Sequence, residues 1–150
     1  MDRASLRILL VDDDEDDYFL TQDLLRDIPD SRFELVWISD PDLALEAICR
    51  KEFDLCLVDY RLGKTDGLSL LRTAIEQGCR VPIILLTGQG ERAVDLHAMR
   101  AGAADFLEKS RLDAALLERS IRYSLQGQRH ADELEHRVQE RTAELALANQ

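Results

Sequence analysis

Carboxylate, hydroxyl and ammonium side chains stand at the ends of apolar runs in this sequence, and together they suit phosphoryl transfer. Asp12 and Asp13 follow one run, Asp59 and Thr87 stand just beyond two others, and Lys109 follows a fourth. Converging carboxylates make a site for a hard divalent cation such as Mg²⁺. A hydroxyl and a compact positive charge beside them can stabilise phosphoryl oxygens, while a carboxylate can accept the group as an acyl phosphate.

The elements that must position these side chains follow from the apolar pattern. Five short runs bounded by Gly, Pro or Asp predict buried parallel strands at 6–11, 33–39, 54–58, 81–86 and 104–107. Helical patterns lie between and after them, which predicts an α/β fold with a doubly wound, flavodoxin-like sheet. The expected strand order is 2-1-3-4-5, so the ends of the first and third strands are neighbours.

Local signals mark the five helices. Asp40 is the expected N-cap of a helix with Pro41 at its first position. Apolar residues recur at helical spacing at Leu20, Leu24 and Ile28, at Leu68, Leu71 and Ile75, and at Leu117, Ile121 and Leu125. A further helix is predicted over 91–101, and Gly78 and Gly102 are expected to end the helices that precede them.

Composition narrows the function class. The formal net charge is −11, which argues against nucleic-acid binding by this segment. No apolar run approaches the roughly 20 residues that cross a bilayer, and the N-terminus lacks a signal-peptide pattern, so we expect a cytoplasmic chain. Acids fill positions 12–17, where Asp16 and Asp17 are interpreted as charges that suit the start of a helix.

The cysteines carry no metal or disulfide pattern. Cys49, Cys56 and Cys79 are widely spaced, odd in number and without a Cys-x-x-Cys pair. Cys56 lies in an apolar run and is predicted to be a small core residue.

Four segments together resemble the receiver domains of bacterial two-component response regulators, of which the chemotaxis regulator is the simplest. They are 8–14, 57–62 with Asp66-Gly67, 82–88 and 102–109, in family order and spacing. The resemblance covers roughly residues 5–125. It implies that a histidine kinase or phosphotransfer protein is the partner, and that the domain switches conformation to control an output module rather than acting as an enzyme.

The resemblance also implies roles for single residues. Asp59 would accept the phosphoryl group. Asp13 would bind Mg²⁺ directly and Asp12 through water, while Asp59 and the backbone carbonyl of Arg61 would complete the protein ligands.

Three further positions match the family's phosphoryl-binding and switch residues. Thr87 would bind the phosphoryl group and move on its arrival, Lys109 would pair with it, and Phe106 matches the aromatic switch position. One departure follows Lys109, where Ser110 replaces the usual proline. A cis bond there would cost about 3 kcal/mol, so a trans or strained peptide is expected.

The segment 126–150 is predicted to be a helical linker beyond a receiver domain at 1–125. Leu134, Val138 and Leu145 fit a short heptad seam interrupted by Arg141, and Gly127 is a candidate flexible point. The segment resembles helices that precede output modules in multidomain signalling proteins. A homodimer through this helix is a hypothesis.

Three alternatives compete with the receiver interpretation. A haloacid-dehalogenase-type hydrolase needs Thr or Val where Asp16 stands, and an EF-hand loop from Asp12 needs Gly and Glu where Asp17 and Asp23 stand. A receiver fold that serves only as an interaction module, without phosphorylation, remains the main alternative.

Overall fold

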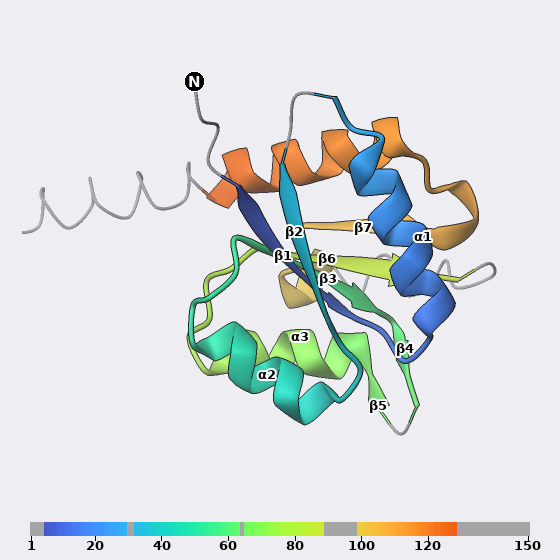
Figure 1. The fold of residues 1–150 in the computed structure, drawn as a ribbon. Coiled ribbons are helices and arrows are strands. Elements are labelled where there is room, and N and C mark those ends of the chain that lie inside the picture. The colour runs from blue at the N-terminus through green and yellow to red at the C-terminus, as the bar shows by residue number, and fades with distance from the viewer. Residues whose placement is uncertain (1–4, 30–31, 64, 89–98, 129–150) are drawn as a thin grey trace, which may run out of the picture.

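A computed structural model describes residues 5–29, 32–63, 65–88 and 99–128, and a five-stranded parallel sheet forms its centre (Figure 1). The strands are β1 (Leu6–Val11), β2 (Phe33–Ile38), β3 (Leu55–Asp59), β6 (Ile83–Thr87) and β7 (Asp105–Glu108). Their spatial order is β2-β1-β3-β6-β7. Counted along the chain these are the first to fifth parallel strands, so the predicted 2-1-3-4-5 order is confirmed.

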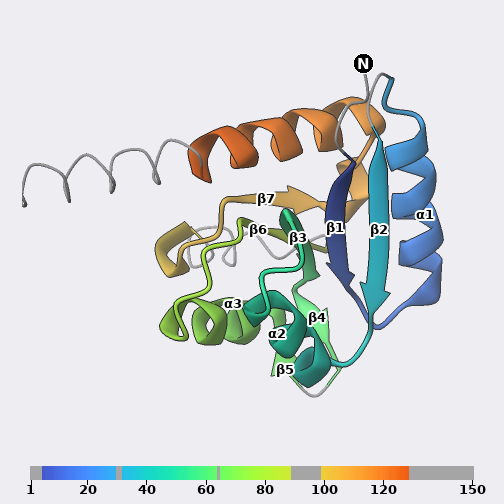
Figure 2. The same ribbon diagram turned by 60° about the vertical axis from the view of Figure 1, so that its left-hand side comes forward.

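Helices cover both faces of the sheet (Figures 1 and 2). The helices α2 (Pro41–Cys49) and α3 (Gly67–Glu76) lie against one face. The other face carries α1 (Glu15–Arg26) and an unlabelled helix over residues 114–128. This arrangement is the doubly wound α/β fold that the alternating pattern predicts.

Alternate residues of each strand enter two separate apolar layers. In β1, Leu9 and Val11 pack on the side of α2 and α3, whereas Ile8 and Leu10 pack on the side of α1 and the last helix. All four side chains are fully buried. A strand covered on both faces must be apolar at every position, which explains the continuous rather than alternating runs in the sequence.

Acidic caps start the helices at the carboxyl edge of the sheet. The Asp40 carboxylate accepts a hydrogen bond from the Asp42 N–H (2.9 Å), and Pro41 opens α2 as predicted. Asp14 caps α1 through the Asp16 N–H at 3.0 Å. These bonds satisfy N–H groups that have no partner within the helix, so each helix begins directly after the strand that precedes it.

The structure changes some details of the expected elements. A short antiparallel hairpin, β4 (Arg61–Leu62) with β5 (Thr65–Asp66), follows β3 and was not predicted. Ile28 lies beyond α1, although it is buried. Ile75 is 42% exposed, because α3 turns Leu70, Leu71 and Ala74 toward the sheet instead.

The ends of the helices agree with the glycine signals where the structure describes them. Gly78 and Gly102 both adopt positive φ, at 82° and 104°. Residues 99–101 are helical before Gly102, while 91–98 of the predicted helix lie outside the described residues. The last helix continues through Gly127 to residue 128, and the predicted seam at 134–145 also lies outside them. No helix in the described ranges is long and apolar enough to span a bilayer.

Candidate functional site

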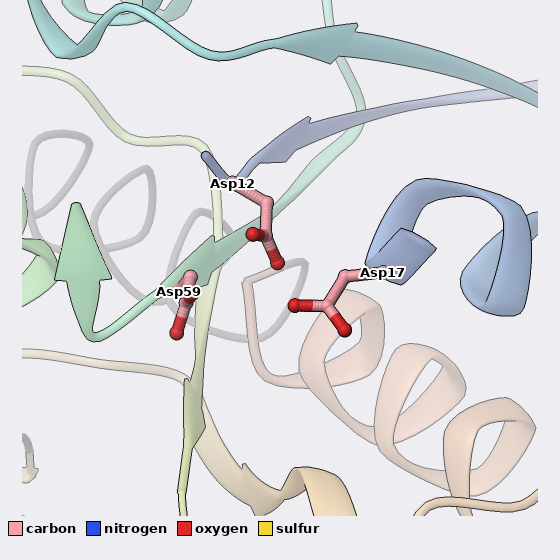
Figure 3. Close-up of side chains that lie close together, drawn as sticks. All are labelled: Asp12, Asp17 and Asp59. Carbon is pink, nitrogen blue, oxygen red and sulfur yellow. The ribbon is translucent and has the colours of Figure 1, made fainter. Parts of the chain in front are cut away.

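Three carboxylates face one another at the carboxyl edge of the sheet (Figure 3). Asp12 directly follows β1, Asp59 ends β3, and Asp17 comes from the first turn of α1. Each offers an oxygen that lies within 4.8 Å of the other two. Asp12 and Asp59 meet because β1 and β3 pair directly, with Val11 opposite Val58.

The Lys109 ammonium holds this carboxylate cluster together. Its Nζ lies 2.5 Å from Asp17 Oδ2, 2.9 Å from Asp59 Oδ2 and 3.2 Å from Asp12 Oδ2. Lys109 opens the 3₁₀ turn η1 (Lys109–Arg111) that follows β7. Because β7 is at one edge of the sheet, the lysine reaches across the strand ends to join residues 50 to 97 positions away.

Burial makes the negative charge of the cluster unfavourable. The Asp12 side chain is fully buried, and burial, reinforced by the charges of Asp59 and Asp17, raises its pKa to about 7. Burial likewise raises the pKa of Asp59, although Lys109 opposes that shift. Burial would lower the pKa of Lys109, but its hydrogen bonds to Asp17 and Asp59 outweigh this and raise it. The site therefore holds more negative charge than its ammonium neutralises.

Backbone N–H groups orient the two buried carboxylates, and a ring N–H binds the backbone beside one of them. The Asp14 N–H donates to Asp12 Oδ1 at 2.9 Å, and the Arg61 N–H donates to Asp59 Oδ1 at 3.3 Å. The Trp37 indole N–H donates to the backbone carbonyl of Asp12 at 2.7 Å. Each carboxylate thus has one oxygen fixed by the backbone and its other oxygen turned to Lys109.

Gly67 allows the chain to pass close beside Asp59. A Cβ atom at position 67 would overlap the Asp59 carbonyl oxygen and lie 2.9 Å from Val58 Cγ1. The Gly67 N–H also donates to the Tyr60 carbonyl at 2.7 Å. The Asp66-Gly67 pair therefore has a physical reason: the aspartate caps α3, and the glycine lets that helix start against the strand end.

The structure also locates the predicted phosphoryl-binding and switch residues. Thr87 is buried at the end of β6, and its hydroxyl donates to the Leu107 carbonyl at 3.5 Å. It directly follows Leu86, which lies opposite Asp59 in the sheet. Phe106 is partly buried in β7 and packs against the apolar layer under α2 and α3. The predicted roles of both residues remain predictions.

The clustered acids differ from those singled out in the sequence. Asp13 is exposed and contributes no oxygen to the cluster found among the described residues. Asp17, interpreted as a helix-start charge, instead faces the pocket and binds Lys109. Its place in the first turn of a helix that begins at the carboxyl edge was the available signal. The roles predicted for Asp13 and the Arg61 carbonyl stay predictions.

The loop after Lys109 follows the trans path expected without proline. No cis peptide bond occurs in the described part of the chain, and Lys109, Ser110 and Arg111 form the 3₁₀ turn. The Ser110 hydroxyl donates to Glu108 Oε1 at 3.1 Å. Lys109 reaches the carboxylates by this path, so the departure from proline leaves the ammonium in the pocket.

Comparison with known proteins assigns this chain to a family. Residues 8–121 match the family model for the response regulator receiver domain. The chain belongs to this response regulator receiver family. It is a receiver domain of the kind found in two-component response regulators, in which phosphorylation on an aspartate controls signalling.

Curated relatives share the domain over part of their length. The chain is 34% identical over 145 residues to the C4-dicarboxylate transport transcriptional regulatory protein DctD of Pseudomonas aeruginosa, covering 97% of this chain and 29% of that protein. It is 33% identical over 119 residues to the transcriptional regulatory protein FixJ of Bradyrhizobium diazoefficiens, covering 77% of this chain and 56% of that one. The chain thus spans less than two thirds of these relatives.

Solved structures give the same result. NtrX from Brucella abortus, in complex with ADP, superposes with a TM-score of 0.76 at 30% identity, covering 93% of this chain and 30% of that one. The signal receiver domain of an HD domain-containing protein from Pseudomonas fluorescens Pf-5 gives 0.74 at 28% identity, covering 89% and 96%. A receiver fold is therefore shared with part of NtrX and with the signal receiver domain of an HD domain-containing protein.

Proposed function

We propose that Asp59 is the phosphoacceptor of this receiver domain. The observation that carries the proposal is the position of its carboxylate, which is buried at the end of β3 and bound by Lys109 beside Asp12. One Asp59 oxygen accepts from the Arg61 N–H and the other from the lysine, so the nucleophile is held in one orientation. Fixed orientation is a large part of what phosphoryl transfer requires from a protein.

The carboxylate cluster fits a divalent cation. It offers oxygen donors only, and burial, followed by the charges of neighbouring carboxylates, raises the pKa values of Asp12 and Asp59, so a further positive charge would stabilise their ionised forms. As the family resemblance implies, Asp13 and Asp59 would bind Mg²⁺ directly, Asp12 would bind it through water, and the Arg61 carbonyl would complete the protein ligands. When bound, the cation supplies positive charge beside the phosphoryl oxygens.

The chemical step needs one bond formed and one broken. An Asp59 oxygen attacks phosphorus, and the bond between phosphorus and the donor's histidine nitrogen or acetyl oxygen breaks. Lys109, released from the Asp59 oxygen it now contacts, pairs with the transferred group. Thr87 donates its hydroxyl to the same group after leaving the Leu107 carbonyl, and these movements would begin the conformational switch that includes Phe106.

The partner and setting follow from this chemistry. We infer a histidine kinase or phosphotransfer protein as the donor and the cytoplasm as the location. The receiver at 1–125 would catalyse only its own phosphorylation and dephosphorylation, and the segment 126–150 would lead to an output module. Dimerisation through that segment is part of the proposal, and a monomeric mass by light scattering at high protein concentration would contradict it.

Intact mass after incubation with acetyl phosphate tests the phosphoacceptor. Wild type and Asp59→Asn are compared with and without Mg²⁺, and Asp23→Asn serves as a matched control, because Asp23 is an exposed aspartate of α1. We expect one added phosphoryl group in wild type and the control, dependent on Mg²⁺, and none in Asp59→Asn.

The same experiment decides the main alternative. No added mass in wild type, also with a histidine-phosphorylated donor protein, would leave an interaction module that works without phosphorylation. Phosphorylation that persists in Asp59→Asn would instead show that another residue accepts the group.

A further inference from the structure

Cys49 and Cys79 bring two thiol groups into contact at the ends of α2 and α3. Their Sγ atoms lie 2.7 Å apart, although the residues are 30 positions apart in the chain. Cys49 is the last residue of α2, and Cys79 follows the turn that ends α3. The third cysteine, Cys56, is fully buried in β3.

Packed elements hold both thiols in place. Cys79 is fixed by a hydrogen bond from its N–H to the Ala74 carbonyl at 3.0 Å, after Gly78 turns the chain with a φ of 82°. Cys49 belongs to the last turn of α2, and its thiol also donates to Gln77 Oε1 at 3.1 Å. The contact between the sulfur atoms is therefore set by the last turn of α2 and by the hydrogen-bonded turn that closes α3.

The two thiols differ from Cys56 in their access to solvent. Cys49 and Cys79 are both partly exposed, whereas Cys56 has no exposed surface. Burial, and then the neighbouring Cys49 thiol, raise the pKa of Cys79 to about 11, an effect that Lys51 opposes. A thiol held in its protonated form is a poor nucleophile, which leaves the first attack on an oxidant to Cys49.

We propose that Cys49 and Cys79 form a redox-modification site, at which a peroxide converts the two thiols into an intramolecular disulfide joining the ends of α2 and α3. The Cys49 thiolate attacks one peroxide oxygen, the O–O bond breaks, and Cys49 becomes a sulfenic acid. The departing hydroxide takes up the proton that the Cys49 thiol lost and leaves as water. The Cys79 sulfur then attacks the Cys49 sulfur and displaces a second water. One peroxide is reduced to two water molecules as two thiols are oxidised to one disulfide, and a dithiol reductant reverses the change.

The disulfide would stabilise the folded domain by joining α2 and α3 on one face of the sheet. It closes a loop across 30 positions and removes conformational freedom from the unfolded chain. A loop of this size predicts a rise of roughly 10 °C in the unfolding midpoint of the oxidised protein. Neither thiol belongs to the carboxylate cluster, so the modification does not depend on phosphorylation of Asp59.

The test is mass spectrometry of the chain treated with hydrogen peroxide. Reduced protein is treated with peroxide, and its remaining free thiols are blocked by alkylation. A peptide map under non-reducing conditions then identifies any disulfide, and the thermal unfolding midpoint is measured on the same sample. We expect a peptide pair linked through Cys49 and Cys79, a raised midpoint that dithiothreitol reverses, and the same result in Asp59→Asn. In Cys79→Ser, Cys49 should stop at the sulfenic acid and be trapped by dimedone.

Cys56→Ala is the matched control and should still form the linked pair. Should that variant not fold, Cys56 in the oxidised wild type serves instead, because it should be the one cysteine still alkylated after unfolding. The proposal is overturned if both Cys49 and Cys79 are still free thiols after peroxide treatment and are therefore alkylated. It is equally overturned if oxidation yields only intermolecular disulfides or sulfinic and sulfonic acids.

Discussion

Replacing Asp12 by asparagine should stabilise the domain at alkaline pH. The Asp12 carboxylate is fully buried, and burial together with the nearby charges of Asp59 and Asp17 raises its pKa from 3.8 to about 7. The folded state therefore binds this proton more tightly than the unfolded state does. Between pH 4 and pH 7 the folded chain holds more protons at Asp12, so this group lowers stability as pH rises, and the loss is complete above pH 7.

The size of the effect follows from the shift. A change of about 3 pKa units corresponds to about 4 kcal/mol of lost stability above pH 7, of which roughly a third is already lost at pH 5. In Asp12→Asn the amide would keep a carbonyl oxygen for the Asp14 N–H but lose the charge facing Lys109 at 3.2 Å, which costs about 1 kcal/mol. We expect the advantage of Asp12→Asn over wild type to grow by about 3 kcal/mol between pH 5 and pH 8.

Urea unfolding at pH 5 and pH 8 in the presence of EDTA measures this difference. Asp23→Asn makes the same change of charge at an exposed position of α1 and should stay within about 0.5 kcal/mol of wild type at both values. An Asp12→Asn variant that is less stable than wild type at pH 8, or whose advantage does not change with pH, would refute the reasoning. Adding Mg²⁺ should stabilise wild type more than the variant, because a ligand stabilises the state that binds it.

Three further predictions test the geometry around Asp59. Gly67→Ala should destabilise the domain by about 1–3 kcal/mol and slow phosphorylation, since its Cβ would overlap the Asp59 carbonyl oxygen; unchanged unfolding and rate would contradict this. Lys109→Met leaves three carboxylates without the lysine ammonium and should lower the free energy of unfolding by roughly 2 kcal/mol at pH 8. Mg²⁺ should restore most of this stability in the same urea unfolding experiment, and a loss that Mg²⁺ leaves unchanged would argue against a shared cation site. Trp37, the single tryptophan, donates to the Asp12 carbonyl at 2.7 Å, so its fluorescence should change saturably with Mg²⁺; a constant signal while calorimetry detects binding would disprove the coupling.

The sequence by itself determined the order of the parallel strands and much of the site. Strands buried on both faces must be continuously apolar, so β1, β3 and β6 are visible as runs, and the residues just beyond them are placed at one edge of the sheet. Asp12 and Asp59 follow from that rule, whereas Lys109 follows the shorter, partly apolar edge strand β7. The cap at Asp40 with Pro41 is equally local, because both residues act within one turn of the helix.

Tertiary structure decided the contacts that depend on how helices are rotated and packed. Asp17 joins the cluster only because α1 presents that face of its first turn to Lys109. The first turn at the carboxyl edge marks Glu15, Asp16 and Asp17 alike, so the sequence does not show which of them will do so. Cys49 meets Cys79 because α2 and α3 end side by side, which no cysteine spacing reveals. The close passage of Gly67 beside Asp59 likewise depends on where α3 starts against β3. Such contacts join segments whose separation in the chain carries no periodic signal, so only the packed fold specifies them.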